Sequence, residues 1–123
     1  MQHMKMTMEF ARNFADEWIN AFNAHDLEMV LSHYTEDFSI KTPVAARLLD
    51  AENGVVAGKE QVRAYWRYAL AQMPDLHFEL LDILIGTDGL TLYYLNTGSG
   101  KKTAEVMTFN DQGLVCQVAA YYC

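Results

Sequence analysis

One carboxylic acid in the C-terminal part of the chain stands among apolar residues. Glu105 lies in the run 103–109, whose residues alternate as in a β-strand, so that Glu105 shares a face with Met107 and Phe109. If that face lines a cavity, loss of solvation raises the pKa of the carboxyl group and makes it a candidate acid or hydrogen-bond donor. If the face is exposed, the residue is a solvated glutamate paired with a preceding lysine, and both interpretations stay open.

A histidine and another glutamate are spaced to share a face of the strand-like run 77–85. His77 and Glu79 stand two residues apart, a spacing that can place a base beside a group that orients it. A solvated or dimer-facing edge explains the same pattern, and the sequence does not say which face is concave. His77 is therefore the candidate base, and Glu105 the candidate acid or donor.

Nine mostly apolar residues could line a pocket for a flat or aliphatic ligand. They are Phe14, Trp18, Tyr34, Phe38, Thr42, Trp66, Met73, Met107 and Phe109. Aromatic residues at helical spacing also form ordinary core, and this alternative stays open. Tyr34 and Trp66 are the favoured pocket residues, because their polar tips prefer a wet edge.

Metal and phosphate chemistry find no support in the motifs. His33 stands near Glu36 and Asp37, but three ligands at fixed geometry are not evident, and a solvated helix end explains the cluster. The segment GSGKK, residues 98–102, lacks the upstream glycine of a phosphate loop and joins two strands. We expect no metal and no cofactor.

Helical periodicity predicts the elements that position the aromatic residues. Residues 7–23 place an apolar residue at every fourth position, which is typical of an amphipathic helix. Asp26 is a good N-cap for a short second helix. Residues 59–73 form the predicted third helix, which ends before Pro74.

Strand patterns occupy the rest of the chain. Residues 38–42 alternate and end at Pro43, and the long connection 43–58 is either a mobile flap or carries a short strand at Val55 and Val56. The runs 77–85, 90–96, 103–109 and 114–122 follow, separated by turns rich in Asp, Asn and Gly. Helices segregated from an antiparallel sheet predict an α+β fold in a single domain, residues 1–123.

The composition of the chain limits the classes of partner that it can bind. The 123 residues suffice for one core, and the formal net charge of -7 opposes binding to nucleic acid or to an anionic membrane surface. No run approaches the roughly 20 apolar residues that cross a bilayer. With two cysteines and no apolar signal stretch at the start, we expect a cytoplasmic protein.

Three segments stand out beside the order of the elements: FNAHDLEMVLSHYTEDFSIKTP, GVVAGKEQVRAYW and FNDQGLVCQVAAYY. Together with that order, they resemble the nuclear transport factor 2-like superfamily, particularly its SnoaL-like and ketosteroid isomerase-like members. The resemblance covers nearly the whole chain and implies a cone-shaped fold, with three helices of the N-terminal half packed on a curved antiparallel sheet. Its members include isomerases, cyclases, dehydratases, hydrolases and binding modules, so function must be argued at the site.

The ketosteroid isomerase pattern is incomplete in this chain. Its oxyanion-hole tyrosine corresponds to Trp18, and its general-base aspartate corresponds to Thr42, which has no basicity at neutral pH. Its second oxyanion-hole acid corresponds to Glu105. The resemblance therefore implies a pocket with one surviving carboxyl group.

Two classes of function follow. One is a cofactor-free isomerase, cyclase or dehydratase that acts on a ketone or polyketide-like substrate through Glu105 and His77. The other is a non-catalytic module that binds a small apolar ligand or serves as a dimeric scaffold. In either case we expect a homodimer, because three helices cannot cover both faces of a sheet with apolar residues on each side.

Overall fold

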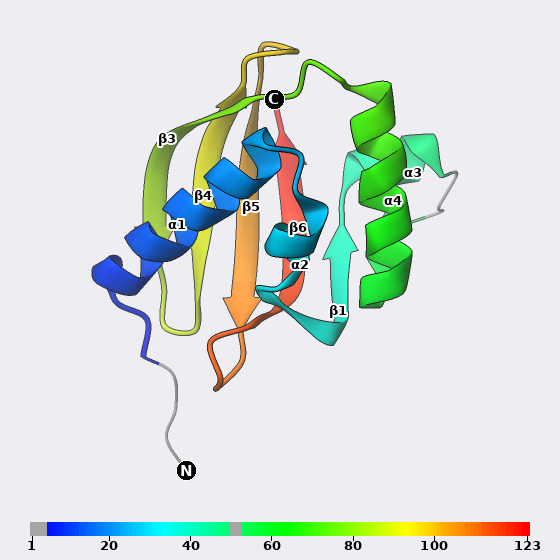
Figure 1. Ribbon diagram of the computed structural model, residues 1–123. Coiled ribbons are helices and arrows are strands. Elements are labelled where there is room, and N and C mark those ends of the chain that lie inside the picture. Colours follow the sequence, from blue (N-terminus) through cyan, green and yellow to red (C-terminus); the bar gives the residue numbers. More distant parts are fainter. Residues whose placement is uncertain (1–4, 50–52) are drawn as a thin grey trace.

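The computed structural model describes residues 5–49 and 53–123, which form four helices and six strands (Figure 1). In chain order they are α1 (Met8–Asn23), α2 (Leu27–Leu31), β1 (Tyr34–Lys41), α3 (Pro43–Leu48), β2 (Val55–Ala57), α4 (Lys59–Gln72), β3 (Phe78–Ile85), β4 (Gly89–Asn96), β5 (Lys101–Phe109) and β6 (Val115–Tyr122). The three predicted helices and the four late strands are confirmed to within a few residues.

The strands form one curved, unclosed sheet in the order β2-β1-β6-β5-β4-β3 (Figure 1). Strands β3 to β6 make the predicted antiparallel meander, and β1 pairs with β2 in the same sense. The pairing of β1 with β6 is parallel, which differs from the expected antiparallel sheet. It is possible because α3, β2 and α4 carry the chain away from β1 before the meander returns beside it. The predicted α+β class is confirmed.

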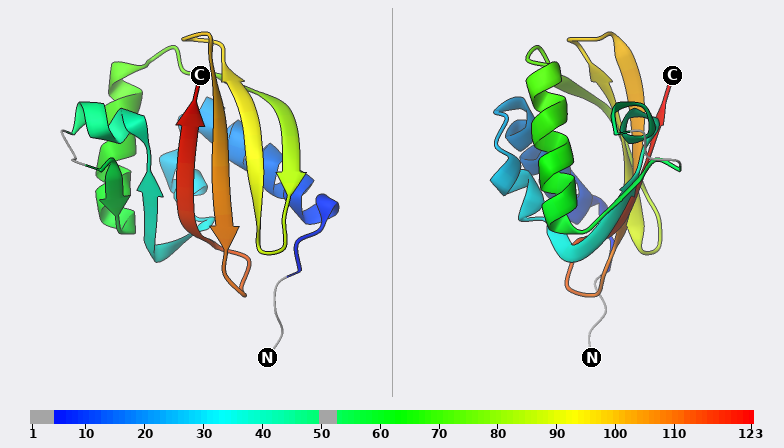
Figure 2. Two further views of the ribbon diagram at one scale, coloured as in Figure 1. Left: turned by 180° about the vertical axis from the view of Figure 1, so that it is seen from behind. Right: turned by 90° about the vertical axis from the view of Figure 1, so that its right-hand side faces the viewer.

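Helices cover one face of this sheet. Viewed along the sheet edge, α1, α2 and α4 lie on the same side (Figure 2, right). α1 packs across β3, and α4 packs against β1. Within the described residues, the opposite face of β3 to β6 carries no helix (Figure 2, left).

The connection after β1 is helical at its start, where the sequence predicted a loose segment. Thr42 caps α3 by accepting a hydrogen bond from the Val44 N–H at 3.1 Å, and Pro43 stands in the first turn, where its missing N–H costs nothing. Pro43 thus ends the strand and begins a helix. The short strand at Val55 and Val56 is confirmed as β2.

Gly54 joins α3 to β2 in a conformation that other residues rarely adopt. Its φ is +70°, and a Cβ at this position would lie 2.7 Å from the Thr42 carbonyl oxygen. The same two residues share a backbone hydrogen bond of 2.9 Å from the Thr42 N–H to the Gly54 carbonyl. The close approach holds the start of α3 beside the end of the sheet.

Candidate functional site

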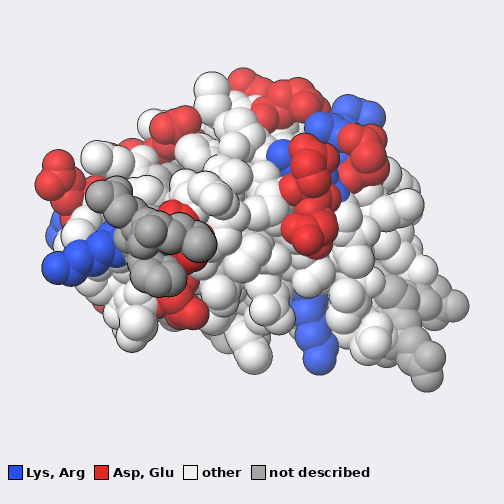
Figure 3. All heavy atoms as spheres, turned by 90° about the horizontal axis from the view of Figure 1, so that it is seen from below, with Lys and Arg blue, Asp and Glu red and all other residues white. Residues whose placement is uncertain are grey.

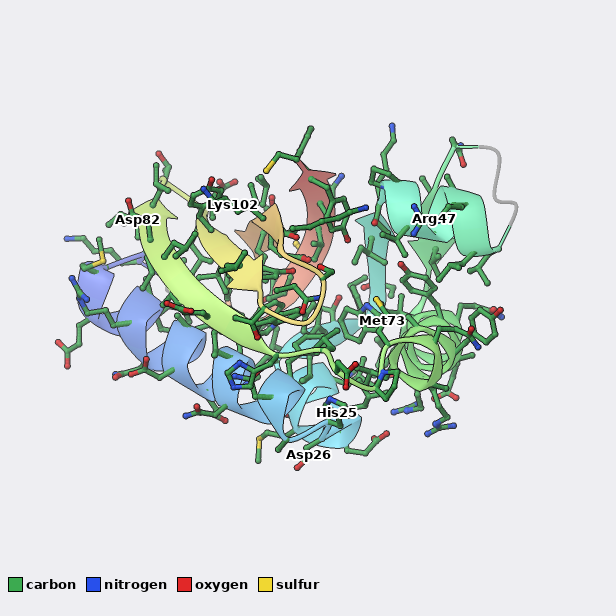
Figure 4. All side chains as sticks on the ribbon, turned by 90° about the horizontal axis from the view of Figure 1, so that it is seen from above. His25, Asp26, Arg47, Met73, Asp82 and Lys102 are labelled. Carbon is green, nitrogen blue, oxygen red and sulfur yellow. The ribbon has the colours of Figure 1, made fainter. Side chains whose placement is uncertain are left out.

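A cavity of about 410 Å³ lies between the helices and the concave face of the sheet. Its apolar wall includes Phe22, Trp66, Leu70, Met73, Leu76 and Phe78, and its polar lining includes Arg47, Asn96, Ser99 and Lys101. Figure 4 looks down on the end where α4 and β6 finish, with Arg47 on α3 and Met73 after α4. The lining residues at this end, Arg47, Ser99, Lys101 and Cys123, are exposed, so the cavity opens here.

Glu105 lines this cavity from β5, and only 6% of its surface is exposed. The predicted alternation is confirmed, since Glu105, Met107 and Phe109 are all buried. Loss of solvation raises the pKa of the Glu105 carboxyl group from 4.5 to about 7, although a hydrogen bond from Tyr94 opposes the rise. Near neutral pH the group therefore exists in both protonation states.

Tyr94 holds the Glu105 carboxyl group from the neighbouring strand. Its hydroxyl donates to Glu105 Oε1 at 2.9 Å, across a diagonal of the β4–β5 pair, in which Tyr94 lies opposite Thr103. The Tyr94 ring packs against Phe78 with centroids 4.3 Å apart. Burial raises the pKa of Tyr94 well above 10, and the charge on Glu105 raises it further, so the phenol stays protonated.

Two more tyrosines bring hydroxyl groups to the cavity. Tyr122 of β6 lies within 3.2 Å of the Thr42 hydroxyl, and Tyr65 of α4 lines the same space. Burial raises the pKa of Tyr65 to about 12, and it raises that of Tyr122 as well. The negative charge of Glu105 contributes to both shifts, while the positive charge of Arg47 opposes them. Both phenols are therefore hydrogen-bond donors at neutral pH.

Two of the nine predicted pocket residues, Trp66 and Met73, line the cavity. The other seven, Phe14, Trp18, Tyr34, Phe38, Thr42, Met107 and Phe109, are buried but do not line it. The structure therefore places them in the core that supports the cavity.

Trp18 and Tyr34 pair with each other in that core. The Trp18 indole N–H donates to the Tyr34 hydroxyl at 2.8 Å, and both side chains are almost fully buried. Tyr34 therefore has its polar tip satisfied inside the protein, where the sequence analysis placed it at a wet edge. The residue that corresponds to the isomerase oxyanion-hole tyrosine is thus used to hold α1 against β1.

The structure does not bring His77 to Glu105. His77 is exposed and precedes β3, and its backbone N–H donates to Asn96 Oδ1 at 3.3 Å. Glu79 is exposed as well, so the face that carries both residues points away from the cavity. The inward residue at the start of this strand is Phe78.

Sequence reasoning missed Tyr65, Tyr94 and Tyr122 as cavity residues. A signal existed for Tyr94, because it continues the alternation of Leu90 and Leu92 on the buried face of β4. For Tyr65 and Tyr122 the direction toward the cavity depends on how α4 and β6 pack. No local pattern reports that packing.

Among residues 5–49 and 53–123, no group of three or more His, Cys, Asp or Glu side chains could hold a metal ion. Over the same residues, no helix has the length and apolar character needed to cross a membrane.

Comparisons with known proteins agree with this architecture. The family model of the SnoaL-like domain matches residues 15–120. A SnoaL-like protein of unknown function from Burkholderia thailandensis is 40% identical, with a TM-score of 0.92, and the match covers 98% of this chain and 99% of that one. Among curated proteins, no sequence matches significantly.

More distant structures share the fold. An NTF-2 like protein of unknown function from Burkholderia xenovorans is 18% identical with a TM-score of 0.71, over 94% of this chain and 84% of that one. A proposed isomerase of the SnoaL-like family from Agrobacterium tumefaciens is 14% identical with a TM-score of 0.70, over 94% of this chain and 98% of that one. At these identities the likeness concerns the fold alone.

Proposed function

This chain belongs to the SnoaL-like domain family, and we propose that it moves a proton on a small, mostly apolar ketone without a cofactor. The observation that carries the proposal is the buried carboxyl group of Glu105 in the cavity wall, with a pKa of about 7. A general acid or base works best when its pKa lies near the working pH. Glu105 meets that condition, whereas an exposed glutamate would be almost fully ionised.

The proposed step is removal of a proton from a carbon next to the ketone. Ionised Glu105 takes the proton, and the electrons of the broken C–H bond form a carbon–carbon double bond while the carbonyl oxygen gains negative charge. A protonated phenol, Tyr122 or Tyr65, donates a hydrogen bond to that oxygen. In a ketone with a β,γ carbon–carbon double bond, the resulting enolate is conjugated with that bond. Neutral Glu105 then returns the proton to the γ-carbon, the carbonyl re-forms, and the double bond has moved into conjugation with it.

Because Glu105 both takes and returns the proton, the proposed step favours isomerisation among the reactions that the family resemblance implies. Glu105 is the one carboxyl group among the described lining residues, and no histidine lies beside it. A single group that takes and returns the same proton ends each cycle in its starting state. A dehydratase or cyclase needs a second group beside Glu105 to protonate a leaving oxygen or a new alcohol, and the hydroxyl that contacts Glu105 is the weakly acidic phenol of Tyr94.

The second candidate function is ligand binding without turnover. Thr42, at the position of the isomerase general base, hydrogen-bonds the Tyr122 hydroxyl and caps α3, and it does not line the cavity. These contacts suit a structural role. On this proposal the cavity sequesters an apolar molecule, and Glu105 serves only as a hydrogen-bonding partner.

Deuterium exchange separates the two functions. A panel of cyclic ketones in D₂O is incubated with the wild type, with Glu105→Gln and with Glu79→Gln, and loss of the α-proton signal is followed by NMR. Glu79 is an exposed glutamate of β3 outside the cavity, so its variant is the matched control. We expect exchange with the wild type and the control only. Binding of the ketones by all three proteins without exchange would leave the ligand-binding module.

We also propose that the protein works as a homodimer in the cytoplasm. The uncovered sheet face supports the first statement, because Leu84, Val106 and Tyr121 are exposed on it. The two cysteines support the second, since Cys116 and Cys123 are both free, as thiols are in a reducing compartment.

A further inference from the structure

Two cationic side chains stand at the opening of the cavity. Arg47 of α3 and Lys101, the first residue of β5, both line it and are both exposed. β6 lies between β1 and β5 in the sheet, and α3 follows β1, so the two cations flank the end of β6. Figure 4 shows this arrangement, with Arg47 on one side of the end of β6 and Lys102, the neighbour of Lys101, on the other.

Within residues 5–49 and 53–123, neither cation has an acidic partner. Among the described residues, Arg47 and Lys101 form no salt bridge, whereas Lys59 pairs with Glu36 and Arg63 pairs with Glu28 and Glu60. At the end of the molecule opposite the opening, basic and acidic groups lie side by side (Figure 3). As far as the described residues go, the two cations at the opening are therefore available to a ligand.

The cations at the opening contrast with the acidic net charge of the whole chain. The sequence has 9 lysines and arginines against 16 acidic residues, yet the charged lining residues are Arg47, Lys101 and the buried Glu105. Both charged side chains at the opening are cations, and such a local excess attracts anionic ligands even when the net charge of the protein repels them. Arg47 also lies close enough to Tyr65 and Tyr122 for its charge to act on their hydroxyls, so its field reaches into the cavity.

The inner part of the cavity determines the size and the apolar character of the ligand body that fits there. Trp66, Phe22 and Phe78 form an aromatic wall, in which the Phe22 ring contacts the other two with centroids 5.3 Å away. The volume of about 410 Å³ is near the lower end of the roughly 300–1,000 Å³ of small-molecule sites. A body of one or two rings fits this space better than a long chain or a large polycycle.

We propose that the ligand is a small carboxylate whose apolar ring system lies against Trp66 and Phe78 and whose anionic group binds Arg47 and Lys101 at the opening. This inference rests on the proposed function only in taking the cavity as the substrate site, and it narrows the ketone to a keto acid. The carbon that reacts then lies between the two ends, beside Glu105. Arginine and lysine both form charge-assisted hydrogen bonds with carboxylates.

A pair of probes with the same ring system tests the anionic end. Binding of 2-naphthylacetate and of neutral 2-naphthylacetamide is measured by calorimetry at pH 7.5 and low salt. We expect the carboxylate to bind the wild type roughly five- to tenfold more tightly than the amide, as two partly exposed ion pairs allow. Arg47→Gln with Lys101→Gln should abolish this preference, so that the two probes bind the double variant equally. Lys102→Gln, which alters the adjacent lysine outside the lining, should keep it.

Three results would overturn the inference: equal binding of the two probes, a preference that survives in the double variant, or binding of neither probe. Equal binding leaves the proposed function standing, since exchange of neutral ketones by Glu105 does not need the cations. Conversely, a carboxylate preference in a protein with no Glu105-dependent exchange overturns the proposed catalysis and keeps the anionic end.

Discussion

The Tyr94 hydroxyl donates a hydrogen bond to Glu105 Oε1 across 2.9 Å, between neighbouring strands of the sheet. Two opposing effects meet at this contact. Burial disfavours the charged carboxylate and raises the pKa, whereas the hydrogen bond favours the charged form and lowers it. The resulting value of about 7 is a balance between the two, so a change in either partner moves the titration of Glu105.

Tyr94→Phe should shift the pH dependence of catalysis upward. Ionised Glu105 is the proposed base, so kcat/KM for the wild type should rise with pH and level off above a midpoint of about 7. Without the phenol, the charged form loses a hydrogen bond, and we expect the midpoint to rise by about one pH unit. Activity at pH 7 should fall several-fold, while activity above pH 9 stays close to that of the wild type. A pH profile of exchange or turnover measures this.

Tyr93→Phe is the matched control, because Tyr93 stands next in the same strand on the other face of the sheet. Its profile should match that of the wild type. A Tyr94→Phe profile with reduced activity at every pH and an unchanged midpoint would contradict the proposed role, since that pattern reports only a loss of structure.

Glu105→Gln should stabilise the protein at alkaline pH. The folded-state pKa of about 7 lies above the ordinary value of 4.5, so the folded protein holds this proton more tightly than the unfolded chain. The wild type is therefore most favoured below about pH 4.5 and loses stability as pH rises to about 7 and above. The full loss is about 3 kcal/mol, since a tenfold change in an equilibrium is worth about 1.4 kcal/mol.

Urea unfolding of both proteins at several pH values between 4 and 9 tests this expectation. The difference in unfolding free energy, variant minus wild type, should increase with pH between about 4.5 and 7 and level off above that range. A difference that does not change with pH would show that Glu105 titrates normally in the folded state.

Alternation in the sequence was sufficient to predict that Glu105 shares a face with Met107 and Phe109, because the strand period groups them whatever the rest of the fold does. It left open whether that face lines a cavity or faces solvent, and the structure shows all three residues buried. The sequence also predicted most helices and strands. It did not predict α3, since the stabilising contacts there are a Thr42 cap and the approach of Gly54 to the Thr42 carbonyl, neither of which depends on apolar periodicity.

Sequence patterns predicted which residues share a face of a helix or strand, but they did not separate cavity wall from solid core. Trp18 and Trp66 both carry an indole N–H on a helix, yet Trp18 finds a partner in Tyr34 and is enclosed, whereas Trp66 faces the empty space beneath α4. The difference depends on which helix lies over the open end of the sheet, which is a tertiary property. The sequence did not predict Arg47 as a lining residue for the same reason, because its position at the opening depends on α3.

The outer face of the sheet should hold two copies of the chain together. Leu84, Thr91, Val106 and Ala119 form a row across four strands, and Leu84 and Val106 are 56% and 40% exposed. An uncovered apolar face of this kind is typical of an interaction surface. We expect the wild type to sediment as a dimer at micromolar concentration and Val106→Glu as a monomer, because the variant buries an unpaired charge.

Tyr68→Glu is the control for this experiment. Tyr68 is 45% exposed on α4, away from the sheet face, so its variant should remain a dimer. Dimers that persist in Val106→Glu would place the contact elsewhere, and a monomeric wild type would refute the dimer itself.

Asn23, the last residue of α1, should be a strong determinant of stability. Its side chain satisfies both backbone groups of Phe78 at the start of β3, accepting from the N–H at 2.7 Å and donating to the carbonyl at 3.0 Å. β3 is an edge strand, so no neighbouring strand can replace these bonds. Asn23→Ala leaves two partly buried groups unpaired and should lower the unfolding free energy by about 1–3 kcal/mol.

Because Phe78 lines the cavity, Asn23→Ala should also weaken ligand binding, and it should do so by a larger factor than Asn20→Ala. Asn20→Ala, one turn earlier on an exposed position of α1, is the matched control and should alter neither quantity by more than about 0.5 kcal/mol. Asn23→Asp keeps the acceptor for the Phe78 N–H but sets a carboxylate oxygen against the Phe78 carbonyl, so it should not restore stability. Chemical unfolding and calorimetric titration with 2-naphthylacetate measure the two effects. Equal stability of the Asn23→Ala and Asn20→Ala proteins would mean that the packing of α1 on β3, and not this pair of hydrogen bonds, holds the strand in place.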